Sequence, residues 1–186
     1  MTQRRIYQEE YPYFVTTRTR DNFPLFENIE YAELIRGIIL EAGAIKQFDI
    51  LAFQIMPDHV HLLAMKKHQT DRMLENMHSA WDMDIGFSLE RTLSSVRSGV
   101  NHKAQPRKKI QFTISDLMQS IKGNFSRVIH QGNIWQPRFY AHIVNTDKYL
   151  DTVIQYIICN PIKAKLPHKF HILPYQYINW KLIRHD

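Results

Sequence analysis

In the first third of the chain, the spacing of apolar residues predicts a strand, then a helix, then two more strands. Tyr11 to Thr19 is rich in aromatic and β-branched residues and precedes a polar turn signal, which predicts a strand. From Ile29 to Lys46, apolar residues return to one face of a predicted helix. Phe48 to Gln54 and His59 to Met65 are joined by a connection so short that they are expected to pair as antiparallel strands.

The last third of the chain adds two predicted helices with a strand between them. Ser115 to Gln131 and Asp147 to Asn160 have apolar side chains at helical spacing, and Pro161 is expected to end the second helix. Trp135 to Val144 alternates as a strand does. The order β-α-β-β-α-β, then one more helix, predicts an α+β fold: a ferredoxin-like split β-α-β arrangement with an antiparallel sheet.

Two segments do not fit this pattern. Residues 66–109 carry scattered Met, His, Trp and Ser and end in a basic run, so we interpret them as an insertion or lid. Residues 167–186 form a tail punctuated by proline that is too short for its own core and is expected to pack back on the domain. We therefore expect residues 1–186 to form a single domain with one insertion.

Composition and charge limit the class of protein, its partners and its expected location in the cell. Hydrophobic residues make up 44% of the 186 residues, which excludes a wholly disordered chain. The net charge of +6 favours polyanionic partners without proving nucleic-acid binding. The single cysteine, Cys159, excludes an internal disulfide, and no apolar stretch reaches the roughly 18 residues of a membrane helix. We expect a cytoplasmic, nucleoid-associated protein with no membrane partner.

Two histidines are the first candidate ligands. His59 and His61 lie two apart in a predicted strand, so their side chains point to one face and could share a divalent cation. Ten His in 186 residues give about half of one such pair by chance, so a structural pair is the competing interpretation.

A second pair of candidates lies on the last predicted helix. Tyr156 and Asn160 are four apart and lie outside the centre of the apolar stripe, which leaves them able to face a site. The competing interpretation is that Tyr156 covers the edge of the core and Asn160 only ends the helix.

Together these four residues could perform phosphoryl transfer. Two neutral imidazoles and an amide oxygen would hold a divalent metal while a tyrosine hydroxyl attacks phosphorus and forms a covalent ester. Mixed nitrogen and oxygen ligands suit Mg²⁺ or Mn²⁺ on phosphates, and Zn²⁺ is also compatible with these ligand types. Tyr140, which shares a strand face with Arg138 and His142, is a second candidate nucleophile, or part of an exposed amphipathic face.

Several ordered motifs resemble the IS200-like single-tyrosine transposases that carry the HUH motif, and in particular their REP-associated branch. The matching segments are Met56 to Leu63, Ile121 to Arg127, Ile134 to Ile143 and Tyr156 to Ala164. The family commonly has Asn at the position of Asp58, its usual connection is shorter than residues 66–109, and the Trp-Ser-Ser ending often seen is absent here.

The resemblance implies a nuclease dependent on Mg²⁺ or Mn²⁺ that nicks and transfers single-stranded DNA at palindromic hairpins, as in DNA transposition. His59, His61 and Asn160 would be its metal ligands, and Tyr156 the nucleophile that keeps the 5′-phosphate and releases a 3′-hydroxyl. The resemblance is compatible with a monomer or a homodimer.

Two other functions remain open on the sequence. One is a hairpin or single-stranded DNA-binding module without cleavage activity, with Trp81 and Trp135 stacking on unpaired bases. The other is a small metallohydrolase unrelated to DNA, which would leave the tyrosine without a purpose. Seven basic side chains are candidate phosphate contacts, although each could equally be a solvated surface residue. These are Lys122, Arg127, Arg138, Lys103, Arg107, Lys108 and Lys109.

Overall fold

The computed structural model describes residues 11–67 and 111–183. Contacts divide the chain into one unit of residues 1–67 and 112–186 and another of residues 68–111, and the fold below is that of the first. Its strands are β1 (Tyr13–Arg18), β2 (Phe48–Ile55), β3 (His59–Lys66), β4 (Tyr140–Ile143) and β5 (Gln176–Ile178). Its α-helices are α1 (Ile29–Lys46), α3 (Ile114–Val128), α4 (Asp147–Lys163) and the short α5 (Trp180–Ile183). Three short 3₁₀ turns occupy Arg20–Asn22, Leu25–Glu27 and His168–His171.

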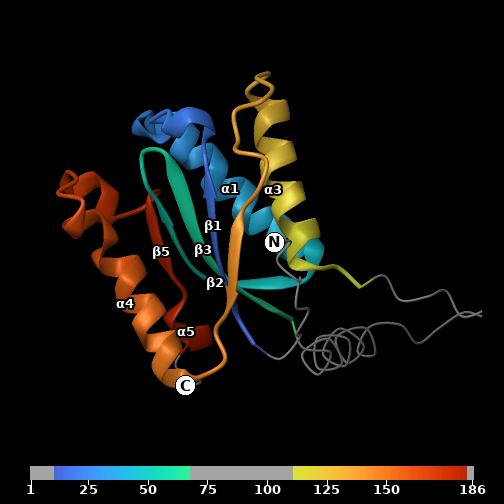
Figure 1. The fold of residues 1–186 in the computed structure, drawn as a ribbon, viewed down its shortest axis with the longest axis vertical. Coiled ribbons are helices and arrows are strands. Elements are labelled where there is room, and N and C mark those ends of the chain that lie inside the picture. Colours follow the sequence, from blue (N-terminus) through green and yellow to red (C-terminus); the bar gives the residue numbers. More distant parts are fainter. Residues whose placement is uncertain (1–10, 68–110, 184–186) are drawn as a thin grey trace, which may run out of the picture. The chain divides into compact units, whose positions relative to one another are not determined.

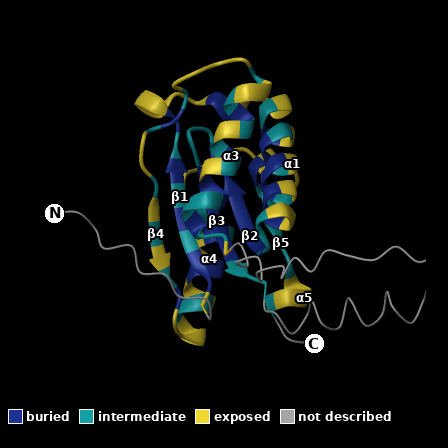
Figure 2. Ribbon diagram, turned by 90° about the vertical axis from the view of Figure 1, so that its right-hand side faces the viewer, coloured by how far each residue is buried: buried dark blue, intermediate teal, exposed yellow. Residues whose placement is uncertain are grey.

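The five strands form one antiparallel sheet in the order β4-β1-β3-β2-β5. The first four in this order have the split β-α-β arrangement that the sequence predicts, so the predicted fold class is confirmed. Helices α1 and α3 cover one face of the sheet and α4 covers the other (Figure 1). The sheet between them is largely buried, whereas the outer sides of the helices are exposed (Figure 2).

Alternation along β3 divides its side chains between these two layers. Val60 and Leu62 are buried in the larger core cluster under α1 and α3, while Leu63 belongs to the smaller cluster under α4. Since neighbouring strand residues point to opposite faces, His59 and His61 share the α4 face with Leu63. The strand pattern therefore fixes the side of the sheet on which both imidazoles lie.

The helix ends follow local capping chemistry. Asn28 caps α1 by accepting the backbone N–H of Glu30 at 2.9 Å. Thr113 and Asp116 form a reciprocal capping box at the start of α3. Near the end of α1, Gly43 allows close packing on β2, because a Cβ there would lie 2.8 Å from Cγ1 of Ile50.

Two sequence predictions about element bounds are wrong. Pro161 lies inside α4 and does not end it; its missing N–H costs one helical hydrogen bond, and the helix closes when the N–H of Ala164 donates to Asn160 O at 3.0 Å. The strand predicted over 135–144 is reduced to β4. Trp135 forms only an isolated bridge with Thr19. Pro137, which has no N–H to donate, lies in the irregular segment between this bridge and β4.

The C-terminal tail packs back on the domain as predicted. Strand β5 pairs with β2 as a fifth strand, which the sequence does not predict. Gln54 is fully buried, and its amide donates to the carbonyl of Phe170 at 2.9 Å. Gln176 donates to Gln54 Oε1 at 2.8 Å and to the carbonyl of Ile158 at 3.3 Å. The tail is thus hydrogen-bonded both to the sheet and to α4.

Candidate active site

Four side chains from β3 and α4 converge at one end of the sheet. Their meeting point is Nε2 of His61, which lies 3.2 Å from Nε2 of His59, 3.3 Å from the hydroxyl of Tyr156 and 3.1 Å from the amide nitrogen of Asn160. Tyr156 and Asn160 are 95 and 99 residues away from His61 in the chain. The structure therefore brings together all four residues that the sequence singles out for metal binding and nucleophilic attack.

Helix α4 positions its two residues through the apolar stripe that packs on the sheet. Val153, Ile154 and Ile157 are buried in the cluster that also contains Leu63 of β3. Tyr156 and Asn160 lie one helical turn apart beside this stripe, so packing of the stripe holds both against the histidines. The Tyr156 side chain remains 40% exposed, which leaves its hydroxyl accessible to a substrate in solution.

Asp58 and Arg18 hold the first histidine in a chain of polar contacts. Nδ1 of His59 donates to Oδ1 of Asp58 at 2.5 Å, and Nη1 of Arg18 donates to Oδ2 of the same carboxylate at 3.0 Å. Because the carboxylate can only accept from Nδ1, the proton of a neutral His59 sits there and the lone pair of Nε2 faces the site. The orientation and the tautomer of His59 are set together.

His61 is held by strand β1. Its Nδ1 lies 2.8 Å from Oγ1 of Thr16, the residue directly opposite in the β1–β3 register. The ring of Phe14 stacks on the imidazole with centroids 5.5 Å apart and meets Tyr156 edge-on at 5.8 Å. Phe14 and Thr16 therefore restrict both the rotation of the ring and its position relative to the tyrosine.

Burial keeps both imidazoles neutral. Desolvation is the largest cause that lowers the pKa of His61 to about 3, and the neighbouring His59 and Arg18 contribute to the same shift. Desolvation also lowers the pKa of His59, against an opposing effect of the hydrogen bond and charge of Asp58. Neutral imidazoles are the form that binds metals.

The donor set fits a divalent cation. Within the described ranges, no group of three His, Cys, Asp or Glu side chains could hold a metal ion. Asn160 is placed to offer an oxygen beside the two imidazoles, because rotation of its amide by 180° places Oδ1 where Nδ2 contacts His61. Two imidazole nitrogens and an amide oxygen are compatible with Mg²⁺ or Mn²⁺.

Tyr140, the second candidate nucleophile, lies apart from this cluster. It is opposite Thr16 in the β1–β4 register, so it shares the sheet face of His61 but is two strands away. Its side chain is 63% exposed, and His142 on the same face is also exposed. The shared face predicted for Tyr140 and His142 is confirmed, whereas Arg138, predicted on the same face, precedes β4 and is not part of the strand.

The predicted basic contacts have different surroundings. Lys122 is half-buried, and its Nζ donates to the carbonyl of Gln136 at 2.6 Å; burial lowers its pKa. Arg127 is exposed and donates to Asn124, and Arg138 is exposed just before β4. The prediction that Trp135 stacks on bases is contradicted, because its ring is only 7% exposed and packs in an aromatic cluster. The remaining candidates lie outside the described residues: Lys103, Arg107, Lys108, Lys109 and Trp81.

Sequence reasoning did not find the residues that hold the histidines. Phe14, Thr16 and Arg18 alternate on one face of β1, but only the antiparallel register places that face beside β3. The signal available in the sequence was an Asp immediately before the H-x-H pair, since a carboxylate commonly orients a metal-binding histidine.

The chain is similar to a curated protein and to several solved structures, two of which are described below. No family model matches the sequence. The REP-associated tyrosine transposase of Escherichia coli (strain K12) is 22% identical over 160 residues, which cover 86% of this chain and 72% of the relative. This similarity supports the resemblance to the REP-associated branch that the motifs indicate.

One of the two solved structures supports the fold. The structure of a REP-associated tyrosine transposase bound to a REP hairpin matches with a TM-score of 0.63 and 20% identity, over 95% of this chain and 81% of that chain. A putative transposase from Deinococcus radiodurans R1 matches with a TM-score of 0.43 and 17% identity, over 89% and 98% of the two chains. The first match confirms the α+β fold. Among the described residues, no helix is both long enough and apolar enough to cross a membrane.

Proposed function

We propose that this protein is a tyrosine transposase of the REP-associated type, which nicks and rejoins single-stranded DNA at a palindromic hairpin. The observation that carries the proposal is the convergence of Tyr156 and Asn160 with His59 around Nε2 of His61. Metal-assisted phosphoryl transfer needs ligands for the metal and a nucleophile. Here the ligands would be two imidazole nitrogens and an amide oxygen, and the nucleophile would be the tyrosine hydroxyl. The similarity to a REP-associated tyrosine transposase supports DNA as the substrate.

His59, His61 and Asn160 would hold Mg²⁺ or Mn²⁺. The bound cation would supply charge stabilisation for the phosphate oxygens during the reaction. The protein prepares its ligands for this task in two ways: burial keeps both imidazoles neutral, and Asp58 and Thr16 hold their Nδ1 atoms, which leaves the two Nε2 atoms facing the site.

Tyr156 would carry out the covalent step. Its hydroxyl oxygen forms a bond to phosphorus as the bond from phosphorus to the 3′-oxygen breaks. The hydroxyl proton is lost, and the departing 3′-oxygen takes up a proton to become a 3′-hydroxyl. The 5′-phosphate stays on the tyrosine as an ester, so a later 3′-hydroxyl can attack it and restore the DNA without an external energy source.

The open face of β4 suits the path of the substrate strand. Tyr140 and His142 are exposed there, and they lie on the same face of the sheet as His61. Aromatic side chains can stack on unpaired bases, and Arg138 precedes this strand on the exposed surface. A single strand lying over β4 would therefore reach the four-residue site without displacing buried side chains.

The direct test is formation of a covalent adduct. Labelled single strands from palindromic sequences beside the protein's own gene are incubated with Mn²⁺, Mg²⁺ or EDTA and separated under denaturing conditions. We expect an adduct that requires the metal, disappears in Tyr156→Phe and persists in the matched control Tyr140→Phe. Tight hairpin binding without any adduct would contradict cleavage and favour a DNA-binding module. An adduct that persists in Tyr156→Phe would refute the assigned nucleophile.

A further inference from the structure

One row of side chains crosses the whole sheet on the face that α4 covers. The strand registers place Tyr140, Thr16 and His61 opposite one another on β4, β1 and β3. The registers of the next strands continue the row with Gln54 on β2 and Gln176 on β5. Residues directly opposite each other point to the same face of a sheet, so two glutamines lie beside the candidate active site on this face.

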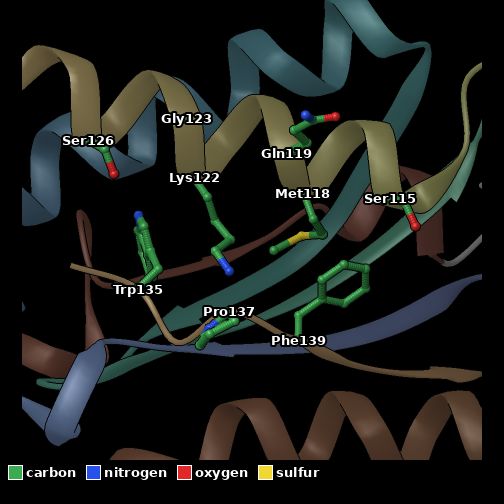
Figure 3. A pocket seen from close by; sticks show the side chains of 9 residues that line it. All are labelled: Ser115, Met118, Gln119, Lys122, Gly123, Ser126, Trp135, Pro137 and Phe139. Carbon is green, nitrogen blue, oxygen red and sulfur yellow. The ribbon is translucent and has the colours of Figure 1, made fainter. Parts of the chain in front are cut away.

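The glutamine end of this row is packed, in contrast to the surroundings of α3. Figure 3 shows a pocket of about 430 Å³ between α3 and the segment that leads into β4. On the α4 side of the sheet, Gln54 is fully buried and Gln176 is partly buried. Burial of an amide is costly unless its hydrogen bonds are satisfied, so the partners of these two side chains indicate what they do.

All four amide hydrogens of the two glutamines have acceptors. Nε2 of Gln54 donates to the carbonyl of Ile55 at 3.1 Å and to that of Phe170 at 2.9 Å. Nε2 of Gln176 donates to Oε1 of Gln54 at 2.8 Å and to the carbonyl of Ile158 at 3.3 Å. An amide nitrogen has two donor hydrogens, so both groups are fully used. The pair therefore ties β2 and β5 to the carbonyl of Ile158 in α4.

That carbonyl belongs to the helical turn that carries the candidate nucleophile and the candidate amide ligand. Ile158 lies between Tyr156 and Asn160 in α4. Pro161 has no N–H, so the helical hydrogen bond to the carbonyl of Ile157 is missing, and the proline ring crowds that carbonyl. This turn is therefore held less firmly by its own backbone than a regular turn is. The donor from β5 adds a hydrogen bond at the next carbonyl along the chain.

We propose that Gln54 and Gln176 are positioning residues that hold this turn of α4 level with His61 on the sheet. The glutamines and the imidazole lie in one row, so the helix is anchored at the level where Tyr156 and Asn160 reach Nε2 of His61. Neither glutamine belongs to the four converging residues, so each would act through α4. The inference rests on the proposed function, because it assigns the pair a role in the geometry of that site.

Gln176→Met removes the donors and keeps a side chain of similar length. Because Gln176 is only partly buried, water can reach the acceptors that it leaves, and the variant should remain folded. Gln176→Asn is a second variant, whose amide is one methylene shorter and should not span both acceptors. Two controls are matched to them. Gln155→Met makes the same change at an exposed position of α4, and Gly43→Ala lowers stability through the packing of α1 on β2.

The first readout needs neither metal nor DNA. NMR cross-peaks between aromatic ring protons report whether Tyr156 lies against its neighbours, since its ring centroid is 5.1 Å from that of His61 and 5.8 Å from that of Phe14. We expect both cross-peaks in the wild type and in both controls. They should be lost in Gln176→Met and weakened in Gln176→Asn.

The second readout separates the chemical step from DNA binding. The rate of adduct formation is measured at saturating Mn²⁺ and hairpin, and the affinity for the hairpin is measured in EDTA. Misplacement of a reacting group by about 1 Å can lower a rate by about 100-fold. For Gln176→Met we expect a rate lower by about 10-fold to 100-fold with unchanged hairpin affinity, and for both controls the wild-type rate.

Four results would overturn the positioning role: ring cross-peaks that are absent from the wild type, cross-peaks unchanged in Gln176→Met, cross-peaks lost equally in Gly43→Ala, or an unchanged rate although the cross-peaks are lost. The adduct assay on the wild type decides the proposed function separately. Cross-peaks lost in Gln176→Met without any wild-type adduct would leave the glutamine anchor standing and refute the proposed function. A wild-type adduct with unchanged cross-peaks in Gln176→Met would do the reverse.

Discussion

Asp58→Ala should weaken metal binding without unfolding the protein. The carboxylate accepts from Nδ1 of His59 at 2.5 Å and from Arg18 at 3.0 Å, and its side chain is 21% exposed. Removal of the acceptor frees the imidazole to rotate and to move its proton to Nε2, the nitrogen that faces the other ligands. The first effect should therefore appear in metal affinity.

The expected magnitude follows from this geometry. A hydrogen bond to a charged group contributes about 1.5–3 kcal/mol, but the carboxylate also holds His59 before the metal arrives, so only part of this energy affects binding. Loss of a partner that orients a metal ligand typically lowers affinity by about 10-fold to 100-fold, or about 1.4–2.8 kcal/mol. Asp58→Asn keeps an acceptor for Nδ1 and loses only the charge, so its affinity should fall by less than about tenfold.

Calorimetric titration with Mn²⁺ measures these affinities directly, and thermal unfolding checks that each variant is folded. Asp151→Ala is the matched control, because Asp151 is an exposed carboxylate on α4 and its loss changes the net charge equally. We expect the order wild type, Asp58→Asn, Asp58→Ala in decreasing affinity, with Asp151→Ala at the wild-type value. Equal affinities of Asp58→Ala and Asp151→Ala would refute the orienting role of Asp58.

Three further predictions concern the fold that supports the site. Gly43→Ala should destabilise the protein by about 1–3 kcal/mol in urea unfolding, because the added Cβ would meet Ile50 at 2.8 Å; unchanged stability would contradict the close packing of α1 on β2. Thr113→Ala should cost about 1 kcal/mol by removing the cap of α3, and Thr113→Ser should restore most of it; equal losses would argue against capping. Because the folded-state pKa of His61 is lowered from 6.5 to about 3, the unfolded chain takes up a proton below pH 6.5 that the folded protein does not. The free energy of unfolding of the metal-free protein should thus fall by about 2 kcal/mol between pH 6.5 and pH 5, and this slope should be smaller in His61→Gln; identical slopes would contradict the burial of a neutral imidazole.

The elements that the sequence predicts well are those whose local signals agree. The helix from Ile29 to Lys46 has the bounds that its apolar spacing predicts, and Asn28 caps its first turn. The face shared by His59 and His61 follows from strand alternation alone. Likewise, the spacing of Tyr156 and Asn160 on one helix was enough to place them on the same side.

What the sequence does not reveal depends on contacts between distant segments. Thr16 contacts His61 only because the β1–β3 register places them opposite each other, and short β5 is a strand only because β2 offers it an edge. Pro161 is tolerated inside α4 because packing of the helix outweighs one lost hydrogen bond. Trp135 is buried by Phe26 and Phe125, which lie in other parts of the chain. The sequence could not show this burial, and the prediction that Trp135 stacks on bases is therefore wrong.

The most direct test of the central claim is to locate the covalent bond in the protein–DNA adduct. The adduct formed with Mn²⁺ is digested with nuclease and protease, and the peptide that carries the nucleotide is sequenced by mass spectrometry. The account predicts a 5′-phosphate ester on Tyr156, the tyrosine whose hydroxyl lies 3.3 Å from Nε2 of His61. An ester on Tyr140 or another residue, or attachment through a 3′-phosphate, would contradict it.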